Sequence, residues 1–507
     1  MKGESLLSKG RGQSLAVLLI AVAVGTILRF FRLGGHELSI DESLSWAESS
    51  EHNVRAVLRV QHQLDSGKFP IYEIVQHGWM RLFGESEMAM RALPALIGSL
   101  SIVLVYLLAK EMLLALGAAT ESSAAASRED VAHALERSRY EYRVCMVAAC
   151  CALLFAVGLP SVEIARQARM YSMMEAWILA QVTFLFRVRR RGGLANYAGL
   201  IVFSAIAVAT NFTAVLVIAA EALWILYLYV ADRDARSDGA AVRSAQPWMM
   251  EAALIAAMVL LLPFFAGLRY GVEGVARGDY NWIKTPGRWE PLATFESALG
   301  TFPFPLFAMF AIVGGLRLWR SHRDEATFLI LWIVVPPIIL FAGSYIVTPM
   351  LVTRYLISSF VPLFILTAVG IESIPSRHYR SVAFIAIVSL SVLRASSDFR
   401  RGDNRWRDAC QKALHKAGPQ QRVGTYNEYY LVKYYMPEDQ RRTVKIVRVP
   451  FEGAERKAPR VVILSPTVAP AEATELRREY SVLAGKFKNV IVVSRPKAGL
   501  RTAPKGC

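Results

Sequence analysis

Two adjacent carboxylates lie directly after the first long apolar run of the chain. Asp41 and Glu42 follow the run Leu15–Phe31, which places them at the boundary between a membrane-length helix and water. A carboxylate is costly in hydrocarbon, so an acidic pair at this boundary is a candidate functional site. Such a group can accept the proton of an attacking hydroxyl as a general base. The simpler interpretation is a solvated helix cap.

Arginines near the ends of other apolar runs supply complementary chemistry. Arg91 precedes the second run, Arg169 lies in a short loop after the third, and Arg354 precedes a late run. A guanidinium binds phosphate oxygens with two parallel hydrogen bonds and stabilises a phosphate as it leaves. Arg91 and Arg354 also fit interfacial anchors, whereas Arg169, on the predicted outer side, runs against the positive-inside rule. Together with the acidic pair, these arginines predict a reaction in which a hydroxyl attacks and a lipid-linked phosphate leaves.

Aromatic and histidine side chains accompany these charges. Tyr72 and His77 lie in the polar segment after the first run, and Tyr171 lies beside the Arg169 loop. All three are candidates for substrate or lipid-phosphate binding. An aromatic belt explains Tyr171 equally well, and a packed interfacial histidine is the simpler interpretation of His77.

Metal binding is left open by the sequence. His36 precedes the acidic pair Asp41–Glu42, and these three side chains are of types that bind a divalent ion. Three such residues on one flexible loop seldom suffice. No cofactor is predicted with certainty.

The composition identifies a multi-spanning membrane protein. Of 507 residues, 54% are hydrophobic and 20% are charged, and the charges cluster between the apolar runs. The runs predict about eleven α-helical spans. They are Leu15–Phe31, Leu93–Leu116, Val144–Leu159, Ser172–Phe186, Leu194–Thr210, Phe212–Val230, Trp248–Leu268, Thr301–Leu316, Ala326–Gly343, Tyr355–Gly370 and Ser381–Leu393.

The distribution of positive charge predicts the orientation. The net charge is +17, and Arg-rich clusters such as 187–191 and 317–323 fall in short loops on one side of the predicted topology. With the N-terminus inside, these loops are cytoplasmic, and the acidic pair, the Arg169 loop and the C-terminal segment are all outside. An orientation signal with contact to anionic lipid explains the basic charge better than nucleic-acid binding.

The chain divides into two predicted domains. Residues 1–394 form a transmembrane catalytic domain whose first outer loop is 32–93, and residues 395–507 form a soluble extracytoplasmic α/β domain. The second domain is expected to contain the helix Arg407–Lys416 and the strands Arg422–Tyr426, Val444–Val449, Arg460–Leu464 and Asn489–Val493. No Gly-rich phosphate loop accompanies these strands, so a structural or acceptor-docking lid is the default role.

Several short motifs resemble the GT-C glycosyltransferases, above all family 39, which includes protein O-mannosyltransferases, bacterial aminoarabinose transferases and many unassigned bacterial relatives. The segments 40–46 and 69–91 resemble the first outer loop of these enzymes. Segment 167–172 resembles a motif after the third span, and Arg354-Tyr355-Leu356 resembles a late-span motif. The order of the motifs over most of residues 15–375 makes the set specific.

The resemblance implies a GT-C membrane fold and inverting transfer of a sugar from a polyprenyl-phosphate donor. By position, Asp41 would be the general base with Glu42 beside it, and Arg91, Arg169 and Arg354 would lie on the phosphate side. The acceptor would be a glycan, a lipid or a protein. The location implied is the bacterial plasma (inner) membrane, with the active site facing the periplasm or cell exterior.

Two other functions remain open. A transporter or flippase of a lipid-linked substrate would carry ionisable residues within its spans and inverted repeats. The main such residues here are Glu175, Glu221 and Glu251, and the two halves show no evident repeat. An O-antigen polymerase or ligase would also use outer arginines, but the acidic pair after the first span is not typical of those enzymes.

Overall fold

The chain is described in a computed structural model. The described residues are 2–65, 69–124, 130–237, 247–261, 283–399, 405–417, 422–425, 428–437, 445–448, 461–464, 482–487 and 490–494. They belong to two compact units. The helical unit comprises Met1–Phe31, Gln61–Gln76 and Arg91–Phe399, and the α/β unit comprises Arg32–Val60, His77–Met90 and Arg400–Cys507.

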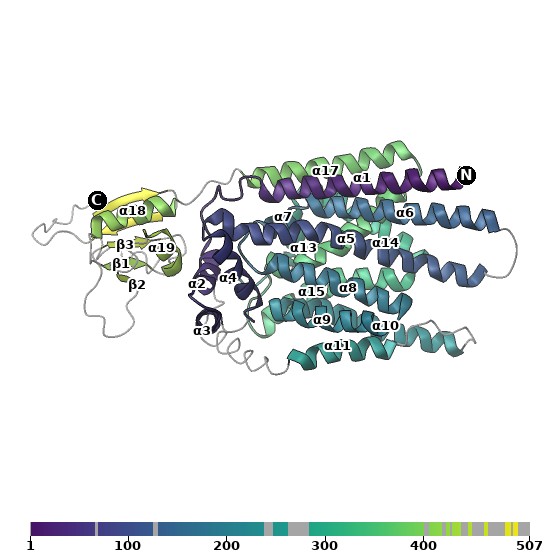
Figure 1. The fold of residues 1–507 in the computed structure, drawn as a ribbon, viewed down its shortest axis with the longest axis horizontal. Helices are drawn as coiled ribbons and strands as arrows, with labels where there is room; N and C mark the ends of the chain where they lie inside the picture. Colours follow the sequence, from purple (N-terminus) through teal and green to yellow (C-terminus); the bar gives the residue numbers. More distant parts are fainter. Residues whose placement is uncertain are drawn as a thin grey trace, which may run out of the picture. The chain divides into compact units, whose positions relative to one another are not determined.

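The helical unit is a bundle of long apolar helices (Figure 1). Its helices, some of which it holds in part, are α1 (Lys2–Phe30), α5 (Glu87–Ala124), α6 (Asp130–Val157), α7 (Leu159–Ala165), α8 (Tyr171–Arg191), α9 (Leu194–Thr210), α10 (Val215–Ser237), α11 (Pro247–Leu261), α13 (Glu290–Leu299), α14 (Pro303–Ser321), α15 (Arg323–Ile346), α16 (Phe360–Glu372) and α17 (Arg377–Asp398). Three short 3₁₀ turns, η1 (Phe212–Ala214), η3 (Thr353–Tyr355) and η4 (Ile357–Ser359), precede α10 and α16.

The predicted class, an α-helical multi-spanning membrane protein, is confirmed. Among the described residues, 6 helices are long and apolar enough to cross a membrane, or up to 7 if α13 and α14, bent by 111°, form one span. Three shorter apolar helices accompany them, Leu194–Thr210, Pro247–Leu261 and Ile357–Glu372. The last residues of the predicted span Trp248–Leu268, those after Leu261, lie outside the described part of the chain. The total of about eleven spans stays a prediction.

Helices α14 and α16 approach each other closely because each carries a glycine at the crossing. A Cβ added at Gly314 would clash with the carbonyl oxygen of Leu366, and one added at Gly370 would clash with that of Phe310. Small residues let helix backbones come together where hydrocarbon supplies no hydrophobic driving force between helices. The packing of these two helices therefore depends on the absence of side chains.

Ion pairs join the end of α8 to neighbouring helices. Three arginines of α8 donate to Glu111 of α5: Arg187, Arg190 and Arg191. Arg189 donates to Asp324 of α15 at 2.5 Å and lies 3.2 Å from a carboxylate oxygen of Glu325. Its guanidinium also lies 5.1 Å from the centre of the Trp224 ring. The arginine cluster that we used as an orientation signal thus also fixes one end of the bundle.

The α/β unit contains a five-stranded sheet of order β2-β1-β3-β5-β4. Strand β1 is parallel to β2 and β3, and β5 is antiparallel to β3 and β4. The strands are β1 (Arg422–Thr425), β2 (Lys445–Arg448), β3 (Val461–Leu464), β4 (Val482–Phe487) and β5 (Val490–Ser494), with helices α18 (Trp406–Ala417) and α19 (Tyr429–Tyr435). The four predicted strands and the helix of this segment are present.

Strand β4 and helix α19 were not predicted. The β4–β5 register shifts between Leu483 and Gly485, and this irregularity interrupts the alternation of side chains on which a strand prediction depends. Helix α19, at 7 residues, is too short to show a helical period.

Two parts of the predicted first outer loop belong to the α/β unit. They carry α2 (Ile40–Ser49), most of α3 (Val54–Leu64) and the end of α4 (Ile71–Phe83). The predicted domain boundary at 394/395 had kept the whole loop with the membrane domain. The grouping reflects contacts of α2 with α19, described below.

We expect Gly314→Ala to lower the thermal midpoint of the detergent-purified protein, because the new methyl group would push α14 away from α16. Overpacking of this kind costs about 1–3 kcal/mol. The matched control is Gly315→Ala, since a Cβ there meets nothing within 4 Å. Alanine is the better helix former, so the control should melt at or above the wild-type temperature. Equal midpoints for the two variants would contradict the close packing.

Candidate functional site

The acidic pair begins helix α2. Ser39 is the N-cap, and it forms a capping box with Glu42. The Glu42 N–H donates to the Ser39 hydroxyl at 3.2 Å, and the Ser39 N–H donates to a Glu42 carboxylate oxygen at 2.9 Å. The spacing Ser-x-x-Glu is the sequence signal for this motif, and we had not used it.

The two carboxylates therefore differ in environment. Glu42 is 2% exposed and its carboxylate serves the cap. Asp41 is half-buried in the same first turn, where the helix dipole stabilises a negative charge. A general base must reach the proton that it removes, and Asp41 meets this requirement better than Glu42.

His77 holds the other end of α2. Its Nδ1 lies 2.9 Å from the carbonyl oxygen of Ser49, the last residue of α2, so this nitrogen carries the proton and donates it. The carbonyls at a helix C-terminus have no partner within the helix, and His77 supplies one. Trp46, also on α2, donates a hydrogen bond from its indole N–H to the Glu85 carboxylate at 2.8 Å. His77 thus supports α2, and its role as a substrate or phosphate contact stays a prediction.

Arg169 lies in a tight turn just before α8. Its side chain is 7% exposed, and its Nη2 is 3.9 Å from a carboxylate oxygen of Asp65. Its backbone N–H donates to the Gln167 carbonyl at 2.7 Å. Tyr171, which is 3% exposed, begins α8 two residues later. Asp65 was missed because it lies far from Arg169 in the sequence, and no local pattern relates the two residues.

Arg166, in the same loop, binds backbone carbonyls instead of a carboxylate. Its Nη1 donates to three carbonyl oxygens at the end of α1, those of Leu28, Arg29 and Phe31, at 3.0, 3.1 and 2.8 Å. Cations at a helix C-terminus bind the last carbonyls and complement the helix dipole. Of the two arginines in this motif, Arg166 caps a helix and Arg169 pairs with a carboxylate.

A buried charge in α1 was also missed. Arg29 is 0% exposed, and its Nη1 donates to the carbonyls of Gly25 and Ala156 at 3.0 and 2.9 Å. Glu175 of α8 is also buried, with 2% of its surface exposed. We had noted Glu175 as an ionisable residue within a span but had taken Arg29 as part of an apolar run.

The other predicted residues occupy separate elements of the chain. Tyr72 in α4 is 0% exposed, and Arg91 in the second turn of α5 is 5% exposed. Arg354 is half-buried on η3, with its guanidinium 5.8 Å from the centre of the Tyr355 ring. Polar side chains are seldom buried to this extent, so Tyr72 and Arg91 stay candidates for a functional site.

The described part of the chain contains no group of three or more His, Cys, Asp or Glu side chains arranged to hold a metal ion. The set His36, Asp41 and Glu42, considered above as divalent-ion ligands, is therefore not such a group, and the capping box engages one of its members.

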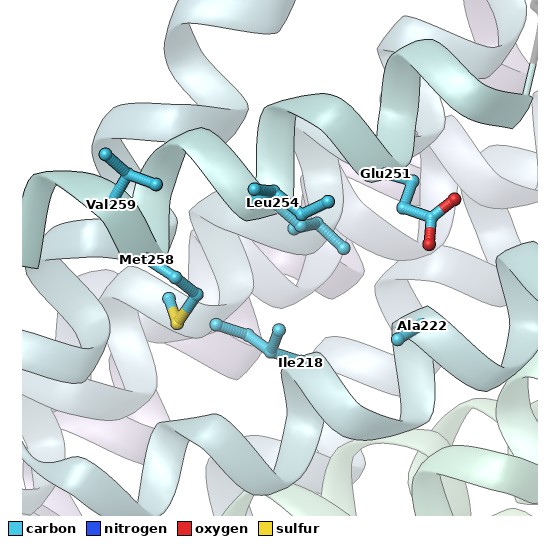
Figure 2. Close-up of a pocket in the computed structure, with 7 residues that line it drawn as sticks. Ile218, Ala222, Glu251, Leu254, Met258 and Val259 are labelled. Carbon is cyan, nitrogen blue, oxygen red and sulfur yellow. The ribbon is translucent and has the colours of Figure 1, made fainter.

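An apolar pocket of about 270 Å³ opens between α10 and α11. Figure 2 shows Ile218 and Ala222 of α10 facing Leu254 and Met258 of α11, with Glu251 at one end. None of the predicted site residues lines it. Of the acids within predicted spans, Glu251 is thus exposed beside a pocket, whereas Glu221 is buried and accepts a hydrogen bond from Gln181 at 2.7 Å.

Solved structures share the fold of this chain. No protein-family model and no curated protein matches the chain. The structure is similar to that of ArnT from Cupriavidus metallidurans in the apo state, with a TM-score of 0.60 and 13% identity, over 96% of this chain and 98% of that one. It is also similar to the same protein bound to undecaprenyl phosphate, with a TM-score of 0.55 and 13% identity, over 95% and 98%.

This likeness extends over nearly the whole of both chains, so it includes the α/β unit as well as the helical unit. The low identity means that the similarity concerns the fold alone. The chain therefore has the fold seen in ArnT, in agreement with the membrane fold that its motifs predicted.

Proposed function

We propose that this chain is a membrane glycosyltransferase that moves a sugar from a polyprenyl-phosphate donor to an envelope acceptor at the outer face of the membrane. The observation that carries the proposal is the likeness to the fold of ArnT over nearly the whole of both chains, and one structure of ArnT holds undecaprenyl phosphate. The motif resemblance in the first outer loop supports it independently. The acceptor class, whether glycan, lipid or protein, and the bacterial inner membrane as the location belong to the same proposal.

In this proposal Asp41 is the general base. The acceptor hydroxyl gives its proton to the Asp41 carboxylate while its oxygen attacks the anomeric carbon of the sugar. The bond between that carbon and the phosphate oxygen breaks on the opposite side, polyprenyl phosphate leaves, and the configuration inverts. Glu42 supports the reaction by capping the helix that carries Asp41.

Arg169 stabilises the phosphate in this proposal. Its side chain is buried beside Asp65, and the 3.9 Å separation is longer than a hydrogen bond, so the carboxylate orients the guanidinium by charge. The guanidinium donors of Arg169 are then already in position to stabilise the negative charge that develops on the departing phosphate. Arg91 and Arg354 are further candidates on the phosphate side, and Tyr72 and Tyr171 are candidates for the sugar and lipid.

The alternative, a transporter or flippase, would use acids within the bundle. One of the three that we noted is engaged by a neighbour in the structure, since Gln181 donates to Glu221. Such a fixed partner suits a rigid scaffold better than a site that must release its cargo. This favours the enzyme.

We expect Asp41→Asn to reduce sugar transfer by about 10²–10⁴-fold, because the amide cannot accept the proton. The measurement is mass spectrometry of lipid-linked sugars and envelope glycans in a deletion strain complemented with each variant. The matched control is Glu42→Gln, since glutamine also completes a capping box and should keep most of the activity. If Glu42→Gln is inactive and Asp41→Asn is active, the base assignment is wrong.

We expect Arg169→Ala to weaken binding of undecaprenyl phosphate by about ten-fold or more, because hydrogen bonds to charged groups contribute about 1.5–3 kcal/mol. Binding is measured as the ligand-dependent rise of the thermal midpoint. Arg166→Ala is the comparison, and it should lower the midpoint of the free protein while leaving the ligand affinity unchanged. Unaltered affinity in Arg169→Ala would remove this residue from the phosphate site.

A further inference from the structure

The C-terminal segment contacts the residues that lead into α2. Both carboxylate oxygens of Glu37 accept hydrogen bonds from the start of α18, one from the Trp406 N–H at 2.7 Å and one from the Arg407 N–H at 2.9 Å. These are N–H groups that have no partner within α18 itself. The preceding residue, Arg405, has a left-handed backbone with φ 62, a conformation that non-glycine residues adopt only when their surroundings require it. The backbone at Arg405 therefore has an unfavourable conformation directly before the N–H groups of α18 that bind Glu37.

A second set of contacts centres on Tyr435 of α19. Its hydroxyl oxygen accepts from the Leu38 N–H at 2.7 Å, and the hydroxyl donates to Glu87 at 3.4 Å. Tyr435 is 8% exposed, and burial is the main cause that raises the pKa of its hydroxyl, which stays protonated at physiological pH. Arg407 donates to the same Glu87 oxygen at 2.5 Å and lies over the Tyr435 ring at 5.5 Å.

The neighbouring tyrosine adds a third contact. The Tyr434 hydroxyl donates to the Glu85 carbonyl at 3.0 Å, and its ring packs edge-on against Trp46 of α2 at 5.3 Å. Trp46 in turn donates to the Glu85 carboxylate. Helix α2 is thus contacted by α19 at Trp46 as well as before its N-cap.

These contacts converge on the first turn of α2. Glu37 and Leu38 immediately precede the N-cap Ser39, and Asp41 is the second residue of the helix. A shift of the backbone at Leu38 must move Asp41, since only the N-cap and one residue of helix separate them. Residues far apart in the sequence, at 37–38 and 406–435, therefore determine where the carboxylate lies.

We propose that Glu37, Glu87, Arg407 and Tyr435 form a latch through which the C-terminal segment positions Asp41 for catalysis. The proposal rests on the proposed function, in which Asp41 is the base. The α2 latch contacts no reacting atom, so its members are positioning residues. The C-terminal segment thereby positions Asp41, a more specific role than the lid predicted from the sequence.

The central test is Tyr435→Phe, which removes one hydroxyl and keeps the ring beneath Arg407. We expect amide hydrogen exchange in residues 40–49 of the full-length protein to accelerate by about ten-fold or more, with exchange in α14 and α16 unchanged. Sugar transfer, followed as consumption of the lipid-linked sugar pool extracted from a deletion strain, should slow by about ten-fold, because small displacements of a catalytic group are costly. The affinity for undecaprenyl phosphate should stay within about two-fold of wild type.

A matched control lies on the same helix. Asp408 of α18 is bonded to Arg405 at 2.7 Å on an exposed surface, and Asp408→Asn should leave both α2 exchange and transfer unchanged. Glu87→Gln should slow transfer like Tyr435→Phe, and the double variant should be little slower than either, because both break one latch. Wild-type exchange and transfer in Tyr435→Phe would overturn the proposal, as would an equal effect of Asp408→Asn.

The exchange measurement needs no substrate, so it separates this inference from the proposed function. Faster α2 exchange in Tyr435→Phe without any sugar transfer by the wild type would support the latch contacts and reject the glycosyltransferase. If sugar transfer is abolished by Asp41→Asn but unchanged in Tyr435→Phe, the glycosyltransferase is supported and the latch is rejected.

Discussion

The hydrocarbon core of a membrane offers no hydrogen-bonding partners, and the rest of the structure follows from this constraint. Every backbone group within the bundle must be satisfied by the helices themselves, and the groups left over at helix ends need side chains. Arg166 meets this need at the end of α1 by binding three carbonyls. At the end of α8, arginines pair with Glu111 and Asp324. Charged residues in this chain are therefore as much a part of the bundle's construction as a sign of its chemistry.

The same constraint makes Arg29 notable. It is fully buried and donates to two backbone carbonyls, one of them on another helix. These hydrogen bonds matter because burying a charged group without partners is costly. Gly98 leaves room for the side chain, since a Cβ there would lie 3.1 Å from the Arg29 Nε. Arg29 thus joins α1 to α6 and limits how these two helices can move.

Asp41 and Glu42 illustrate how neighbouring carboxylates acquire different roles. Successive residues of a helix point in directions about 100° apart, so one side chain can turn back to the N-cap while the next does not. Glu42 completes the capping box and is buried, whereas Asp41 is half-buried. In the proposed function, this difference in environment makes Asp41 the base and Glu42 a positioning residue. The polar segment after the first span is thus organised around a helix whose two ends are both held, by Ser39 and by His77.

The sequence by itself determined the class of the protein and most of its elements. Long apolar runs bounded by arginines admit only membrane helices, and short β-branched runs after residue 421 admit only strands, because each period is a local property. The motifs also indicated the GT-C fold. Only the tertiary structure decided what the polar residues do. Arg166 and Arg169 look equivalent in sequence, yet one caps α1 and the other faces Asp65. Glu37 and Tyr435 carried no signal at all, because a hydrogen bond between distant segments depends on the path of the backbone between them and leaves no local pattern.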